Sequence, residues 1–238
     1  MVASSNPGKR REFEEIFSLL GARAIRLVSP PDAGPEVIET GRTYLANARL
    51  KACAYSSQYN IPALGDDSGL AVDALDGAPG IYTARFGGPG LSAAQRVDLL
   101  LERLRGVPPE RRGARFVCSL YLAYPDGTSV VAHGRVFGRI AGAPRGDAGF
   151  GYDPIFLLPR LGRTMAELAP DEKHRLSHRG HAVKGLLRRF PPSPPPHADW
   201  SLRCAPTAQP PLPQGTRGET RAVPGGSPLS RVRERGRG

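Results

Sequence analysis

Four short stretches of the sequence combine residue types that could carry chemistry, and the first covers residues 4–13, SSNPGKRREF. A small polar loop with one glycine leads there into an expected helix. The free amides and positive dipole of a helix N-terminus attract anions, and Lys9 adds a charge. The loop is not a Walker A motif, because Ser4 and Arg10 stand where that motif needs Gly and Ser or Thr. An ordinary capped helix start explains the pattern equally well.

The second stretch, GDDSGLAVDALDGAPG at residues 65–80, places two carboxylates side by side. Asp66 and Asp67 follow an expected strand and precede Ser68 and Gly69. If the strand continued, the two side chains would point to opposite faces, whereas a bend would bring both toward a cleft. The glycines favour a tight acidic turn, where carboxylates can hold Mg²⁺ and orient a water for phosphate chemistry. A solvated acidic turn is the alternative.

The third and fourth stretches supply aromatic and basic groups. In RGDAGFGYDPIF, residues 145–156, Phe150 lies on flexible backbone that favours stacking on a base, whereas Tyr152 is expected in the core. In ELAPDEKHRLSHRGHAVKGL, residues 167–186, Lys173 could neutralise phosphate, and two residues could donate to a base carbonyl, His178 and Arg179. A solvated basic helix end accounts for the neighbouring His174, Arg175, His181 and Lys184.

The elements that must position these groups alternate between helix and strand. Apolar spacing predicts helices at 8–21, 43–58 (with Thr43 as N-cap), 91–106 and 179–190. Strands are expected at 24–28, on both sides of the acidic turn within 61–75, and in a hairpin over 114–140 closed by Pro-Asp-Gly. Because hairpin and crossover signals coexist, we predict an α/β fold with a mixed sheet.

Composition separates a body from a tail. The chain has 238 residues, and from residue 191 onward proline and glycine interrupt every periodic pattern. We therefore expect one domain over 1–190 and a disordered Pro/Gly/Arg-rich tail over 191–238. The tail could be a basic arm for a partner, but a non-functional extension is the favoured interpretation.

Charge and cysteines bound the class of protein. Lys and Arg number 33 against 22 Asp and Glu, a net charge of +11 that suits polyanionic ligands but carries little weight alone. Three cysteines without a CxxC pair argue against a disulfide framework and a structural zinc site, and suit a reducing compartment. No apolar run approaches the roughly 18 residues of a membrane span, so we expect a cytoplasmic protein without a membrane partner.

Taken in order, these stretches resemble the inosine triphosphate pyrophosphatase family, also called XTP/dITP diphosphatases. The matching segments run from the first residues to about 187: SSNPGKRREF, ETGRTYLANARLKA, GDDSGLAVDALDGAPGIYTARFGG, GFGYDPIF and ELAPDEKHRLSHRG. The resemblance implies an elongated, two-lobed α/β fold with the active cleft between the lobes, assembled as a homodimer. It also implies hydrolysis of ITP, dITP or XTP to the monophosphate and pyrophosphate, with Mg²⁺ as cofactor.

The resemblance also implies residue roles. Asp67 would be the general base and a metal ligand, with Asp66 and Glu39 supporting the metal. Donors from His178 and Arg179 would pair with the 6-oxo group of the base. Guanine shares that group, and we hypothesise that the site rejects it by excluding its 2-amino group. The remaining substrate contacts would come from Ser4, Ser5, Asn6, Pro7, Gly8, Lys9, Ser68, Phe150, Gly151, Tyr152, Asp153 and Lys173.

Two departures from the family pattern stand out. Only three residues precede Ser4, so the strand before the phosphate loop is short. The chain also has Ala46-Asn47-Ala48 where relatives often have Glu-Asn-Ala, which removes one carboxylate. Two alternatives remain: a septum-inhibitor-type diphosphatase acting on dTTP or UTP, and a basic nucleic-acid-binding protein. Nucleic acid is not the expected partner, because the specific motifs lie in the body rather than in the basic tail.

Overall fold

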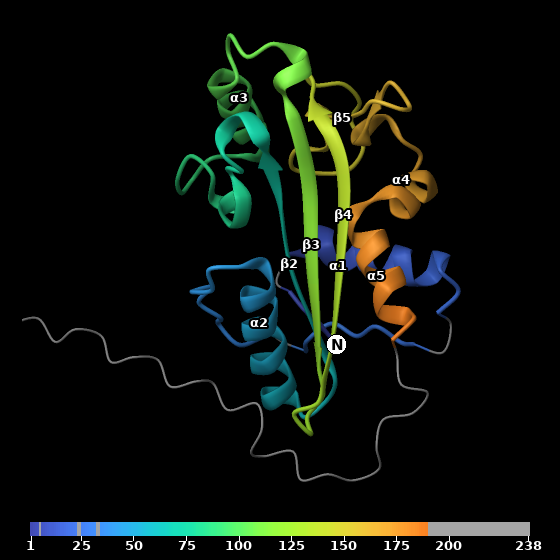
Figure 1. Cartoon of the computed structure of the whole chain (residues 1–238). Helices are drawn as coiled ribbons and strands as arrows, with labels where there is room; N and C mark the ends of the chain where they lie inside the picture. The colour runs from blue at the N-terminus through green and yellow to red at the C-terminus, as the bar shows by residue number, and fades with distance from the viewer. Residues whose placement is uncertain (5, 23–24, 32–33, 190–238) are drawn as a thin grey trace, which may run out of the picture. The chain divides into compact units, whose positions relative to one another are not determined.

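The computed structural model describes residues 1–4, 6–22, 25–31 and 34–189. Ser5 and the predicted tail over 191–238 lie outside the described residues. The described part is built on a six-stranded mixed sheet (Figure 1), which confirms the predicted α/β class. Its strands, in spatial order, are β1 (Val2–Ala3), β2 (Ala63–Val72), β3 (Gly113–Ala123), β4 (Ser129–Ile140), β5 (Phe156–Leu158) and β6 (Arg163–Thr164).

Strand directions follow from the connections. β1 runs parallel to β2, and every later neighbour pairs antiparallel. The predicted hairpin is confirmed as β3 and β4, with the turn closed by a bond from the Gly127 amide to the Tyr124 carbonyl (3.0 Å). The alternating apolar side chains of β3 are all buried, as predicted: Phe116, Cys118, Leu120 and Leu122.

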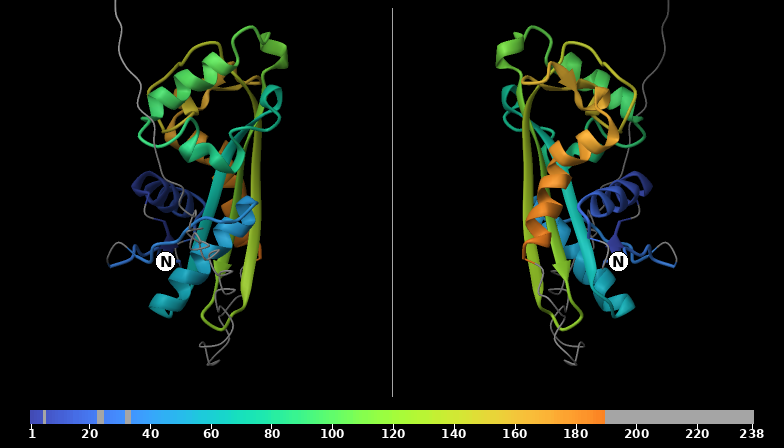
Figure 2. Two further views of the ribbon diagram at one scale, coloured as in Figure 1. Left: turned by 90° about the vertical axis from the view of Figure 1, so that its left-hand side faces the viewer. Right: turned by 90° about the vertical axis from the view of Figure 1, so that its right-hand side faces the viewer.

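Among the described residues, five α-helices flank this sheet: α1 (Pro7–Leu19), α2 (Tyr44–Tyr59), α3 (Ala93–Arg103), α4 (Pro170–Leu176) and α5 (His178–Leu187). Four of them match predicted helices, and Thr43 caps α2 by accepting from the Ala46 amide (3.1 Å). The seven-residue α4 was not predicted, because so short a helix carries too little apolar periodicity. Figure 2 shows α1, α3 and α4 on one side of the long strands. No described helix has both the length and the apolar character needed to cross a membrane.

The predicted acidic turn is wrong, because β2 continues unbroken through both aspartates. Asp66 pairs with Leu120 and Asp67 with Ser119 in the ladder to β3, so their backbone groups are satisfied as strand. The glycine before them serves close packing instead of turning: a Cβ at Gly65 would overlap the Ala48 carbonyl oxygen of α2. The two carboxylates therefore point to opposite faces of the sheet.

The predicted strand at 24–28 is also wrong, since the described residues 25–28 form none. β1 is only two residues long and offers little edge for pairing. One backbone bond, from the Val2 amide to the Val28 carbonyl (3.1 Å), joins this segment to the sheet.

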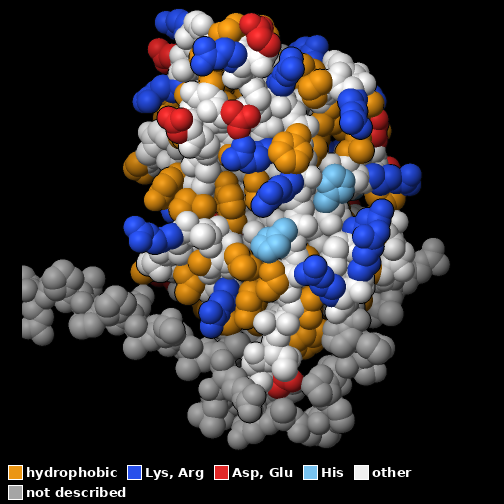
Figure 3. Space-filling view, in the orientation of Figure 1, with side chains coloured by type: hydrophobic (Ala, Val, Ile, Leu, Met, Phe, Trp, Pro, Cys, Tyr) orange, Lys and Arg blue, Asp and Glu red, His pale blue; other side chains and the backbone are white. Residues whose placement is uncertain are grey.

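Two hydrophobic cores pack on the long strands. One joins α3 to the segments around β5, and its members include Leu70, Phe116 and Phe156. The other joins α1 and α5 to the other halves of the same strands, and its members include Phe13 and Leu120. Between the two cores the strands carry polar side chains, and this is where the site lies. Figure 3 shows basic side chains dispersed among apolar and neutral ones over one face of the described part.

Candidate active site

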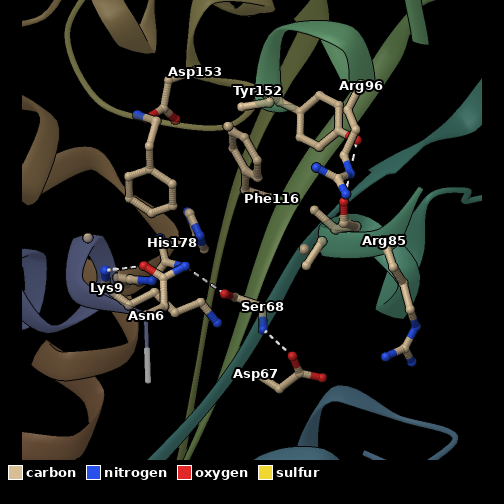
Figure 4. Close-up of a pocket in the computed structure, with 18 of the residues that line it drawn as sticks. Asn6, Lys9, Asp67, Ser68, Arg85, Arg96, Phe116, Tyr152, Asp153 and His178 are labelled. Carbon is tan, nitrogen blue, oxygen red and sulfur yellow. Dashed lines mark hydrogen bonds between the residues drawn. The ribbon is translucent and has the colours of Figure 1, made fainter. Parts of the chain in front are cut away.

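A pocket of about 420 Å³ lies where the two cores meet (Figure 4). It gathers residues from segments far apart in the sequence: the start of α1, β2, the 3-10 helix η2 (Gly80–Arg85), α3, the 150–153 loop and the start of α5. Most of the predicted site residues line it, namely Asn6, Gly8, Lys9, Glu39, Asp67, Ser68, Phe150, Gly151, Tyr152, Asp153, His178 and Arg179. Among the described predicted residues, Ser4, Pro7, Asp66 and Lys173 do not.

Asp67 projects from β2 toward α2, where an amide and an ammonium hold its carboxylate. Asn47 donates from Nδ2 to Oδ2 (3.1 Å), and the Ser68 amide donates to Oδ1 (3.0 Å). Lys51 Nζ lies 3.9 Å from Oδ1. Burial raises the pKa of Asp67 above its usual 3.8, and Lys51 and Asn47 oppose that shift only in part. A carboxylate fixed in orientation and with raised proton affinity suits a general base.

Glu39 shares the Lys51 ammonium with Asp67, because Lys51 Nζ lies 2.5 Å from Glu39 Oε1. Two carboxylates around one cation are a donor set that Mg²⁺ accepts, since this ion is commonly held by one or two carboxylates together with substrate phosphates. Among the described residues no group of three His, Cys, Asp or Glu side chains could hold a metal by itself. Glu39 and Asp67 are thus carboxylates that could hold a magnesium ion together with a bound phosphate.

Asp66 belongs to a different network, on the opposite face of β2. Its carboxylate is 1% exposed and lies 2.7 Å from Lys9 Nζ. Ser68 Oγ donates to Oδ2 (3.3 Å), Cys118 Sγ donates to Oδ1 (3.2 Å), and Arg179 Nε is 3.9 Å away. Asp66 therefore faces cations and donors rather than Asp67 and Glu39, and its predicted part in the metal shell does not fit this geometry.

The segment before α1 has the form expected of an anion-binding loop. Asn6 caps the helix by accepting from the Lys9 amide (3.1 Å), and its own amide donates to Ser4 Oγ (3.2 Å). Pro7 is the first residue of the helix, where its missing amide costs nothing. Gly8 lines the pocket, and its amide lies at the N-terminus of α1. The positive end of the helix dipole therefore faces the pocket.

Phe150 is 38% exposed and lines the pocket next to the start of α1, because a Cβ at Gly8 would lie 3.9 Å from its ring. Lys173 Nζ and Arg179 Cζ lie 5.3 Å and 5.2 Å from its ring centroid. Lys173 pairs with Asp153 (2.7 Å), which also accepts from the Phe150 amide (2.9 Å). Lys173 lines a neighbouring cavity of about 260 Å³ that shares Phe150 as a wall. Tyr152 is in the core as predicted, but its side chain also lines the pocket.

His178 and Arg179 begin α5 beside that ring, and both are buried. The His178 ring stacks on Phe116 with centroids 4.8 Å apart. Arg179 donates to Glu12 Oε2 (2.9 Å) and to Ser68 Oγ (2.7 Å), which fixes its guanidinium beside the pocket. Two donors are thus preorganised on one wall, ready for an acceptor on a ligand.

The chain is also similar to known proteins over most of its length. The sequence model of the Ham1 family matches residues 1–189. The chain belongs to the Ham1 family.

Relatives in the Ham1 family are similar over most of their length. A protein from Geobacillus kaustophilus named dITP/XTP pyrophosphatase is 48% identical over 186 residues, which are 78% of this chain and 91% of that protein. A protein of the same name from Thermus thermophilus is 47% identical over 196 residues, 82% and 93% of the two chains. The structure of a HAM1 protein from Coxiella burnetii matches with a TM-score of 0.68 at 40% identity, covering 77% of this chain and 93% of that one.

Several residues of this Ham1 family member reach the site without having been predicted. Asn47 and Lys51 hold Asp67 from α2, and Glu12 holds Arg179 from α1. The i, i+4 spacing of Asn47 and Lys51 indicated that both lie on one face of α2, but no local pattern showed that this face packs against β2. His174, predicted as solvated, is buried and lies 2.9 Å from Glu15 of α1.

The buried His178 makes stability depend on pH. Burial lowers the pKa of His178 well below 6.5, and the Arg179 charge lowers it further. In the unfolded chain this histidine gains a proton as the pH falls through about 6.5, but in the folded chain it stays neutral. We therefore expect the free energy of unfolding to fall as the pH is lowered from 7 to 5.

Urea unfolding at several pH values measures this effect. His178→Gln should flatten the slope between pH 7 and 5, whereas the matched change His181→Gln, at an exposed position of the same helix, should not. An unchanged slope in His178→Gln would show that other groups cause the loss.

Proposed function

We propose that this chain hydrolyses the non-canonical purine nucleoside triphosphates ITP, dITP and XTP to the monophosphate and pyrophosphate. The observation that carries the proposal is the single pocket that brings together a cationic helix start, an oriented carboxylate and an aromatic wall with fixed donors. These three parts suit the phosphates, the attacking water and the base, in that order. The relatives named dITP/XTP pyrophosphatases support the same substrate class.

The phosphate end is the start of α1. The positive end of this helix and the Lys9 ammonium would bind the triphosphate, together with Asn6 and Gly8. Lys9 already lies 2.7 Å from the Asp66 carboxylate, so its ammonium is held close to the hollow. Ser4 would act indirectly, because it accepts from the Asn6 amide.

Asp67 would orient the attacking water and take its proton. Asn47 and the Ser68 amide hold one carboxylate orientation, so little reorganisation is needed when the water attacks the α-phosphorus. We assign the magnesium ligands to Glu39 and Asp67, and leave Asp66 to hold Lys9 and Arg179. When bound, Mg²⁺ would neutralise phosphate charge that develops in the transition state.

The base end combines stacking with donors. Phe150 would stack on the purine, and donors from His178 and Arg179 would meet its 6-oxo group. Because burial keeps His178 neutral, its ring offers a single N–H, and Arg179 supplies the charged donor. Adenine would place a 6-amino donor against these donors and leave them unpaired, which disfavours ATP. Lys173 and Asp153 would support Phe150 from behind.

The proposal has three broader parts. We propose residues 1–190 as the catalytic domain, supported by the family match over 1–189. A cytoplasmic location is supported by the three cysteines of the sequence, which form no CxxC pair and suit a reducing compartment. A homodimer is supported only by the family resemblance.

A triphosphate panel tests the proposal. Purified protein is incubated with ITP, dITP, XTP, ATP, GTP, dTTP or UTP, and both pyrophosphate and monophosphate are measured. We expect rapid turnover of the first three with equal amounts of the two products, and loss of turnover when a chelator removes Mg²⁺. Preference for dTTP or UTP, or release of orthophosphate instead of pyrophosphate, would contradict the proposed function.

A further inference from the structure

Two arginines in the pocket wall, Arg85 and Arg96, have no role in the proposed chemistry. Arg96 lies on α3 and lines the pocket, yet among the described residues no carboxylate lies within ion-pair distance of its guanidinium. Its Nη1 donates to the Leu91 carbonyl, and its Nε is buried without an acceptor. A half-buried guanidinium without a counter-charge is costly unless a ligand supplies an acceptor.

The position of Arg96 indicates which part of a nucleotide it would meet. Figure 4 shows its guanidinium beside the Tyr152 ring and across the hollow from Lys9. Burial raises the pKa of Tyr152 to about 12, and the nearby Arg96 charge partly offsets that shift. Phe116 and the His178 ring stacked on it line the same pocket. Arg96 thus lies beside Tyr152, across the pocket from Lys9 and the start of α1.

Purine bases differ in what they present to such a donor. Xanthine carries oxo groups at both C6 and C2, so it has a second acceptor, and its ring loses a proton more readily than hypoxanthine does. Hypoxanthine has only hydrogen at C2. Guanine has an amino group at C2, and this hydrogen-bond donor would face the donors of the guanidinium. A guanidinium that faces C2 is therefore expected to bind xanthine better than hypoxanthine, and guanine least well.

We propose that Arg96 is a specificity-determining residue that binds the 2-oxo group of xanthine, and so favours XTP over ITP and disfavours GTP. Donors then act on two sides of the base: His178 and Arg179 on the 6-oxo edge, and Arg96 at C2. This inference rests on the proposed function, because it names which member of that substrate class the pocket prefers.

The test compares XTP with ITP, which share the same sugar and phosphates and differ only at C2. In Arg96→Met, which keeps the apolar stem, we expect the ratio of kcat/KM for XTP to that for ITP to fall by roughly 10- to 100-fold, the range of one charge-assisted hydrogen bond. We expect GTP turnover relative to ITP to rise. Arg103→Met is the matched control, because Arg103 lies on the same helix, is exposed and does not line the pocket.

The outcomes separate this inference from the function on which it rests. An unchanged XTP-to-ITP ratio, or an equal loss for both substrates, overturns the assignment of Arg96 while the pyrophosphatase function stands. If the unaltered protein hydrolyses neither substrate, the function itself fails. Thermal unfolding checks that Arg96→Met is folded. Should it not be, Arg96→Gln replaces it with the same expected fall, since the charge is lost there too.

Discussion

Asp67→Asn should lower kcat for ITP and XTP by about 10²- to 10⁴-fold, the range that a positioned general base contributes. The amide keeps the shape of the carboxylate, but it has one acceptor oxygen and so keeps only one of the two contacts, from Asn47 or from the Ser68 amide. It also accepts no proton from water. Pyrophosphate release under single-turnover conditions measures the effect. Equilibrium binding of a nucleotide should survive in part, because Lys9 and Phe150 remain.

The matched control is Asp76→Asn. Asp76 lies in a turn with φ of 51°, a left-handed conformation that asparagine adopts readily. This change removes a carboxylate of the same kind away from the pocket and should leave turnover within about twofold of the unaltered protein. Near-normal turnover in Asp67→Asn would instead exclude this side chain as the base.

Asp66→Asn should have the second large effect. It should lower the free energy of unfolding by about 3–5 kcal/mol. The change leaves the half-buried Lys9 and the buried Arg179 without their shared partner, and removing the buried carboxylate of such an ion pair is costly in this range. Burial alone would raise the pKa of Asp66, but Lys9 and Arg179 outweigh it and hold that pKa well below 3.8. The stabilisation is therefore present above about pH 4 and is lost as the pH falls below it.

Urea unfolding at pH 7 and at several acid values measures both parts of this prediction. Asp73→Asn is the control, because Asp73 pairs with Arg115 at an exposed site. Such surface pairs contribute at most about 1 kcal/mol. If Asp66→Asn costs no more than the control, Asp66 is not the centre of the buried charge network.

Much of the secondary structure followed from local patterns. The apolar spacing of residues 8–21 and 91–106 identified α1 and α3, because an amphipathic helix buries one stripe whatever it packs against. The Pro-Asp-Gly turn between two alternating segments identified the β3–β4 hairpin. Most segments that line the pocket could also be predicted, because residue types suited to chemistry are recognisable in a sequence. Here they are adjacent carboxylates, an aromatic residue between glycines, and His-Arg at a helix start.

Local patterns failed where partners from distant segments decided the outcome. Gly65 and the two aspartates after it read as a turn, yet the ladder to β3 and the close approach of α2 make this segment a straight strand. That result places Asp66 and Asp67 on opposite faces and so separates the buried charge network of Asp66 from the carboxylate that we propose as the general base.

The sequence by itself determined four of the five described α-helices and the hairpin of this protein, and which residue types are present for chemistry. Only the tertiary structure decided which of those residues meet. Asn47 and Glu12 are unremarkable in their own helices, and Arg96 belongs to an ordinary amphipathic pattern. Each acquires a role because another element packs against it, and such contacts depend on chain segments up to 167 residues apart rather than on neighbours in sequence.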